Sequence, residues 1–207
     1  MSLTAEQLRA ALDHVAGLEP RIAGALANAG YPEPRGRARG PATMMRAIVG
    51  QQVSVKSAES VWNKLEIACG GDMDNHGRIA ETPFDVLRSA GLSRQKASYV
   101  QGLAQAIATG GVDFQNLPAD DEAAIAALTS IKGIGRWSAE IYLLFAEGRP
   151  DVFPAGDLAV QIELGKILGL DARPTEKATR SLAEPWRPHR GALAVFLWHH
   201  YSIDALG

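Results

Sequence analysis

A glycine-rich turn between two expected helices is the first feature that could do chemistry. Residues 131–135 read IKGIG, with a helical segment directly after them. Gly133 and Gly135 can adopt positive φ and let another backbone come close. The first N–H groups of a helix from Arg136 lack partners within that helix, so the turn is able to hold an anionic phosphate oxygen. Glycines also cap helices in many proteins, so the turn alone leaves both interpretations open.

Helices must position this turn, because nearly every segment of the chain has helical character. After Ser54, apolar residues recur on one helical face, at Val55, Ala58, Val61, Trp62, Leu65 and Ala68. Residues 138–147 and 190–201 are apolar on most sides, which predicts central helices. No alternating strand pattern of useful length is present. Further helix starts are predicted at Thr82–Pro83, Ser93, Asp120 or Asp121, and Thr175. The sequence therefore predicts an all-α fold.

Two stretches interrupt this pattern. Residues 31–42, YPEPRGRARGPA, are rich in Pro, Gly and Arg and predict a surface loop, either solvated or in contact with a DNA backbone. Residues 68–83 are predicted to be irregular.

Composition narrows the class of protein. The chain has 207 residues, 46% hydrophobic and 21% charged, with a net charge of −2, as expected of a globular protein with ample core material. The near-neutral charge argues against a DNA-packaging role. Cys69 is the single cysteine, so an intrachain disulfide and a cysteine-ligated iron–sulfur cluster are excluded. Neither a signal peptide nor a membrane-spanning segment is recognisable, so we expect a cytoplasmic, intracellular location.

Four ordered blocks carry a resemblance to a known family. They are MMRAIVGQQVS, GLSRQKA, the hairpin through VFPAGD, and WRPHRGALAVFLWHHY. Together they resemble the helix-hairpin-helix DNA glycosylase superfamily, in particular alkylbase glycosylases of the 3-methyladenine glycosylase II kind. The similarity runs from about Pro41 to Tyr201. It implies one two-lobed glycosylase unit over residues 1–207, with a middle lobe at about 41–130 and a second lobe of the N-terminal helices plus 131–207. The N-terminal β-lobe of longer relatives is not expected.

The resemblance also implies a function. Such an enzyme acts in base excision repair on damaged double-stranded DNA: it flips alkylated purines such as 3-methyladenine and 7-methylguanine out of the duplex and hydrolyses their N-glycosyl bond. Bifunctional relatives carry a Schiff-base lysine where this chain has Trp137, so a monofunctional enzyme is expected. The alternatives are a non-catalytic helix-hairpin-helix DNA-binding protein and a bifunctional oxidised-base glycosylase. A monomer without membrane association is expected.

Asp157 is the catalytic carboxylate that the resemblance implies. Cleavage of an N-glycosidic bond builds positive charge on the sugar, which a carboxylate stabilises while it orients the attacking water. Asp157 also precedes the predicted helix LAVQIELGKILGL, where aspartate is a good N-cap. The two roles are compatible.

The resemblance further implies a base pocket and a wedge. Trp137 and Trp198 would offer aromatic faces to a cationic base, with Tyr142 and Gln51 beside them. The family's pocket tyrosine falls on Ile141 here, which leaves the substrate range open. Gln52 would fill the gap in the base stack. The simpler interpretations are core tryptophans, as expected for Trp62 and Trp186, and a polar pair at a helix end for Gln51 and Gln52.

The hairpin itself completes the implied site. Gly133, Gly135 and Arg136 would contact a DNA phosphate, and the backbone carbonyls of Thr129, Ile131 and Ile134 would hold a monovalent cation, K⁺ or Na⁺. No organic cofactor and no iron–sulfur cluster is expected. Residues 90–97 are similar to a segment that many members of the superfamily carry ahead of this hairpin.

Overall fold

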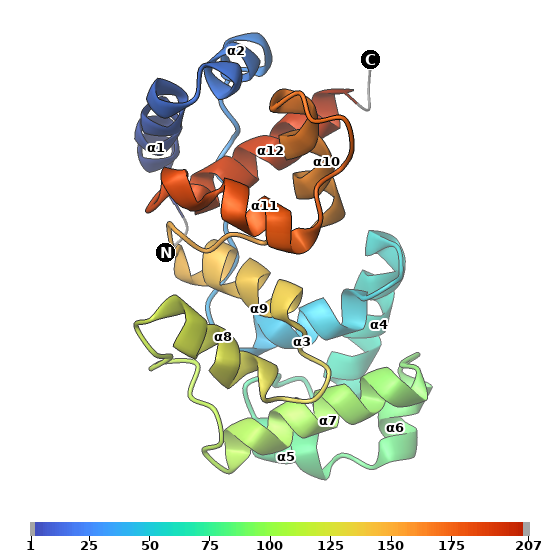
Figure 1. Cartoon of the computed structure of the whole chain (residues 1–207). Coiled ribbons are helices and arrows are strands. Elements are labelled where there is room, and N and C mark those ends of the chain that lie inside the picture. The colour runs from blue at the N-terminus through green and yellow to red at the C-terminus, as the bar shows by residue number, and fades with distance from the viewer. Residues whose placement is uncertain (1–2, 205–207) are drawn as a thin grey trace. The chain divides into compact units, whose positions relative to one another are not determined.

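The computed structural model describes residues 3–204, and within that range it contains helices and turns but no β-strand (Figure 1). This confirms the all-α prediction. The chain divides into two compact units. Ala38–Ala139 forms the middle unit, and the segments before and after it together form the discontinuous unit. The hairpin, residues 131–135, thus lies in the middle unit. The prediction places it in the second lobe, which it starts at residue 131.

The discontinuous unit is built around its C-terminal helix. Helix α12 (Arg190–Asp204) contacts α1, α2 and α10. Phe196 on α12 and Leu12 on α1 are fully buried in the shared core. The other elements of this unit are α1 (Ala5–Leu18), α2 (Pro20–Ala29), the π-helical turn η1 (Leu143–Glu147), α10 (Leu158–Ile167), α11 (Glu176–Leu182) and the 3₁₀ turn η2 (Glu184–Trp186).

The middle unit is organised by α7 (Arg94–Ala108), which contacts α3, α5 and α6. Its apolar face buries Ala97, Val100 and Leu103. The remaining helices are α3 (Pro41–Gly50), α4 (Val55–Ala68), α5 (His76–Glu81), α6 (Phe84–Ser89) and α8 (Asp121–Thr129). Helix α9 (Arg136–Tyr142) begins in this unit, and its residues 140–142 belong to the discontinuous unit.

Most predicted helix starts are confirmed, because capping is local chemistry. The hydroxyls of Ser54, Ser93 and Thr175 each accept the backbone N–H three residues on, as a good N-cap does. Asp120, rather than Asp121, caps α8. Trp62, Trp186 and Cys69 are buried as expected.

Several boundaries differ from the predictions. Pro83, not Thr82, is the N-cap of α6, because the Thr82 hydroxyl donates to the Arg78 carbonyl and ends α5. Residues 68–83, predicted to be irregular, contain the six-residue helix α5. The helix expected over 138–147 starts at Arg136 and widens into a π-helical turn that ends at left-handed Gly148. No helix within residues 3–204 is long and apolar enough to cross a membrane.

Candidate functional site

The hairpin glycines have different structural roles. Gly133 has φ +97°, a conformation that L-residues rarely adopt. A Cβ at Gly133 would overlap the ring of Tyr99 on α7 and lie 2.7 Å from the Tyr99 Cβ. The backbone at Gly133 can therefore pack against α7 only because the residue is glycine.

Gly135 behaves otherwise. It does not have positive φ, contrary to the expectation for both glycines, and no heavy atom lies within 4 Å of the position its Cβ would take. Its carbonyl accepts the Ala139 N–H at 3.1 Å, so Gly135 starts α9. The open space leaves the backbone at this helix start accessible to a ligand.

Arg136, the predicted phosphate contact, forms an ion pair with a side chain of α8. Its two terminal nitrogens lie 2.9 and 2.5 Å from the Glu122 carboxylate oxygens. Both side chains are partly or largely exposed. A phosphate would have to compete with Glu122 for this guanidinium, so the backbone groups are the stronger candidates for the contact.

A polar pocket of about 460 Å³ adjoins the hairpin within the middle unit. It brings together the end of α3, the start of α7 and the hairpin, and is lined by Gln51, Gln52, Ser93, Gln95, Lys96, Tyr99, Gly133, Ile134 and Gly135. The Gln51 amide donates to the Gly133 carbonyl at 3.3 Å, and the Lys96 ammonium donates to the Val49 carbonyl at 2.8 Å. Burial lowers the pKa of Lys96. A partly desolvated cation in a pocket without carboxylates suits an anionic or polar ligand.

Gln52 occupies a strained backbone position. Its φ is +55°, and it is the one non-glycine residue with positive φ in the described part of the chain. Such strain costs on the order of 1–3 kcal/mol and tends to accumulate at functional sites. The side chain is exposed, so the turn that follows α3 presents Gln52 to solvent.

Asp157 lies in the discontinuous unit and is held by three donors. Its Oδ1 accepts the N–H groups of Ala159 and Val160 at 3.0 and 3.1 Å, which makes it the N-cap of α10. The same oxygen accepts the indole N–H of Trp198 at 3.0 Å. Three convergent donors fix the orientation of the carboxylate. The N-cap prediction is confirmed, and the bond to Trp198 is a contact that sequence reasoning missed.

The predicted aromatic residues lie in different surroundings. Trp198 is half-buried, and its ring is tilted against Phe145 at a centroid distance of 5.6 Å. Trp137 belongs to the middle unit, and 48% of its surface is exposed. Tyr142 is 2% exposed and Ile141 is 8% exposed, so both are buried rather than open to a ligand. Trp198 is thus the predicted aromatic that contacts Asp157 directly.

The hairpin carbonyls are suited to a monovalent cation. The Ile131 carbonyl accepts the Ile134 N–H at 3.1 Å, while within residues 3–204 no backbone N–H donates to the carbonyls of Thr129 or Ile134. The Thr129 hydroxyl donates to the Ile125 carbonyl within α8 at 2.8 Å. Backbone carbonyls can replace the hydration shell of K⁺, so the residues present fit such an ion.

The sequence predicts Ser93 only as a helix cap and gives no role to Gln95, Lys96 or Tyr99, and all four line the hairpin pocket. The similarity of residues 90–97 to a family segment indicated that this segment matters. It did not indicate that these residues lie beside the hairpin and the end of α3. Glu140 follows Trp137 by three residues in α9; it is 1% exposed and pairs with Arg180.

Comparison with known proteins defines the class. Residues 45–188 match the family described as HhH-GPD superfamily base excision DNA repair protein. The chain therefore belongs to this superfamily. The DNA-3-methyladenine glycosylase 1 of Schizosaccharomyces pombe is 31% identical over 158 residues, which cover 75% of this chain and 69% of that protein.

Solved structures show the same fold. The Schizosaccharomyces pombe 3-methyladenine DNA glycosylase in complex with abasic DNA superimposes with a TM-score of 0.77 at 28% identity, covering 91% of this chain and 94% of that one. A DNA-3-methyladenine glycosidase from Bacillus halodurans gives a TM-score of 0.82 at 26% identity, with 93% and 89% coverage.

Proposed function

We propose that this protein is a monofunctional DNA glycosylase that hydrolyses the N-glycosyl bond of alkylated purines such as 3-methyladenine and 7-methylguanine. Membership of a base excision repair superfamily supports the reaction class. The names of its relatives support the substrate class. The observation that carries the proposal is Asp157, whose Oδ1 is held by two backbone N–H groups and the Trp198 indole.

Asp157 acts on the sugar. As the bond between C1′ and the base nitrogen breaks, its electron pair leaves with the base and positive charge develops on the sugar ring. The carboxylate stabilises that charge and orients a water, whose oxygen forms the new bond to C1′ while a proton is lost. An alkylated base is already cationic, so it leaves without a strong general acid. The products are the free base and an abasic strand.

Trp137 supports monofunctionality. A bifunctional glycosylase forms a Schiff base through a lysine amine, and an indole cannot supply that nucleophile. With nearly half of its surface exposed, Trp137 can offer its ring to a base. Trp198 would form a second aromatic surface next to the carboxylate.

The middle unit holds the DNA. The N–H groups at Gly135 and the start of α9 bind a backbone phosphate, with K⁺ or Na⁺ at the Thr129, Ile131 and Ile134 carbonyls adding positive charge. Gln52, exposed on its strained turn, enters the gap left by the flipped base, and Gln51 lies between that turn and the hairpin. The bound DNA is a damaged duplex, and the protein acts as a monomer.

The test is base release from alkylated duplex DNA, with wild type beside Asp157→Asn. Asparagine keeps a carbonyl oxygen for the three donors, so the cap of α10 persists and only the charge is removed. We expect wild type to release methylated purines and leave uncut abasic strands, and the variant to be slower by about 100-fold or more. Equal melting temperatures serve as the folding control. Tight DNA binding without release by wild type would favour the non-catalytic DNA-binding alternative, and equal release by both proteins would refute the role of Asp157.

A further inference from the structure

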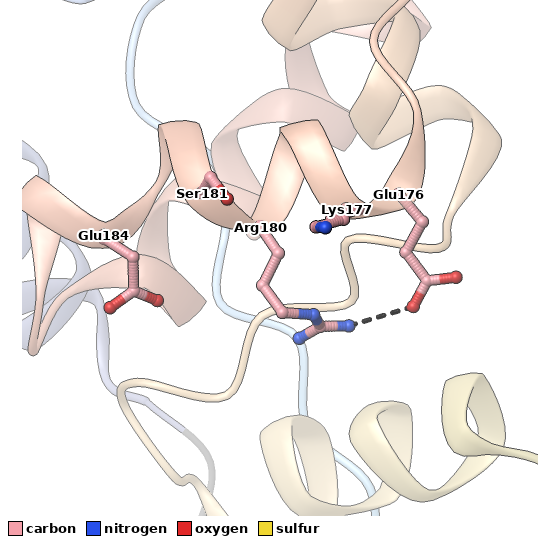
Figure 2. Close-up of a pocket in the computed structure, with 5 residues that line it drawn as sticks. All are labelled: Glu176, Lys177, Arg180, Ser181 and Glu184. Carbon is pink, nitrogen blue, oxygen red and sulfur yellow. Dashed lines mark hydrogen bonds and ion pairs between the residues drawn. The ribbon is translucent and has the colours of Figure 1, made fainter.

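The segment that leads into Asp157 is held by an arginine from a later helix. Arg180 on α11 donates to the Phe153 carbonyl at 3.3 Å. Its second terminal nitrogen donates to Glu140 at 3.2 Å and to Glu176 at 3.1 Å. Figure 2 shows the Arg180 side chain reaching away from α11 and the ion pair with Glu176. Every one of these residues belongs to the discontinuous unit.

Glu140 anchors this arginine. Its side chain is almost fully buried, whereas Arg180 is only partly buried. A buried carboxylate is costly unless it is paired and hydrogen-bonded. The pairing therefore confines the guanidinium to one place, from which it reaches the Phe153 carbonyl.

The backbone between Phe153 and Asp157 is a tight turn. The Ala155 N–H donates to the Phe153 carbonyl at 2.8 Å, and the Asp157 N–H donates to the Pro154 carbonyl at 2.9 Å. Gln161 reaches back from α10 to the Ala155 carbonyl at 2.9 Å. A displacement of Phe153 would consequently be transmitted to the carboxylate.

Glu176 lies close to the same turn. A Cβ on Gly156 would lie 3.2 Å from the nearer Glu176 carboxylate oxygen, so the carboxylate packs against the residue before Asp157. Arg180 holds Glu176 in that place. One guanidinium thus reaches the turn twice, through Phe153 and through Glu176.

We propose that Arg180, anchored by Glu140, is a positioning residue that sets the place of the Asp157 carboxylate. The inference rests on the proposed role of Asp157 in base release. A displacement of about 1 Å in a reacting group can cost roughly 100-fold in rate, so this distant arginine controls the rate without touching DNA. Lysine is a partial replacement: its ammonium keeps the charge that pairs with the carboxylates but cannot reproduce the planar fork that spans a carbonyl and two carboxylates.

The experiment is a double-mutant cycle on single-turnover base release from alkylated duplex DNA. Arg180→Met is measured in the wild-type and the Asp157→Asn backgrounds, with Arg180→Lys as a milder variant. Lys177→Met is the matched control, because it removes a cation from the same helix, and Lys177 makes none of the contacts described above. Binding to duplex DNA with an abasic-site analogue and melting temperature are measured for each protein.

We expect Arg180→Met to slow release by roughly 10- to 100-fold beside an intact Asp157, and by less than about 2-fold in the Asp157→Asn background. DNA affinity should stay unchanged, Arg180→Lys should recover part of the rate, and Lys177→Met should match wild type. Equal slowing in both backgrounds would overturn the inference. A wild-type rate of release by Arg180→Met would also overturn it, and so would a rate for Arg180→Lys as low as that of Arg180→Met. The proposed role of Asp157 would fail separately, if wild type and Asp157→Asn released base equally, and the proposed function would fail if wild type released no base.

Discussion

Replacing Gly133 with alanine should destabilise the protein far more than the same change at Gly135. Alanine at φ +97° costs about 1–2 kcal/mol for its left-handed backbone. Its Cβ would overlap the Tyr99 ring close to the point where that ring joins α7, so the ring cannot simply swing aside. Overpacking of this kind costs about 1–3 kcal/mol. The two terms sum to about 2–5 kcal/mol, or roughly 4–20 °C in melting temperature for a chain of this size.

The assay is urea and thermal unfolding of Gly133→Ala and Gly135→Ala. At Gly135 there is neither positive φ nor a neighbour within 4 Å, so alanine should cost no more than about 1 kcal/mol, the loss of a favourable residue at the start of α9. In a Tyr99→Ala background the cost of Gly133→Ala should fall but stay above the backbone term alone, because the Tyr99 Cβ remains 2.7 Å from the new methyl group. Equal destabilisation by the two glycine variants would refute the reasoning, and an unchanged cost in the Tyr99→Ala background would refute the steric term.

Two further predictions concern titratable groups of the middle unit. Burial raises the pKa of the Cys69 thiol above its ordinary 9.0, so the unfolded chain loses this proton first. The contribution of this pKa shift to the free energy of unfolding is therefore fully present below about pH 9. It decreases as the pH rises toward the folded-state pKa, by at most about 1.4 kcal/mol per pH unit. The free energy of unfolding, measured from pH 7 to 10, should decline in this way for wild type but not for Cys69→Ala. The same decline with pH in both proteins would contradict the prediction. Lys96 lines the pocket at the phosphate-binding hairpin, and we expect it to neutralise one DNA phosphate. Lys96→Met should therefore weaken duplex binding and lower the salt slope of log K by about one. Lys64→Met, which removes an exposed cation of α4, should bind DNA like wild type, and an unchanged slope in Lys96→Met would argue against the contact.

Helix starts and the family blocks could be predicted because their signals are local. Ser54, Ser93 and Thr175 cap helices through atoms three residues away, and the order of short motifs survives in the linear sequence. The π-helical turn after Tyr142 was missed because helical periodicity does not distinguish it from an α-helix. The start of α6 was off by one residue because Thr82 was already engaged with the preceding turn.

The candidate site was predictable by residue type but not by arrangement. Asp157 could be read as an N-cap and as a catalytic carboxylate, yet its bond to Trp198 joins residues 41 positions apart. Tyr142, expected at the pocket, is almost fully buried, since an apolar segment does not reveal which of its faces meets the core. Lys96 received no role, because its place beside the hairpin depends on how α7 packs.

The sequence by itself determined the all-α class, most of the predicted helix starts and the family, because hydrophobic periodicity, capping chemistry and motif order are properties of neighbouring residues. Only the tertiary structure decided that Gly133 and not Gly135 needs to be glycine, and that the buried Glu140 pairs with Arg180. Both outcomes depend on side chains that are distant in the sequence, Tyr99 beside Gly133 and Arg180 beside Glu140. These side chains come into contact only when the helices pack.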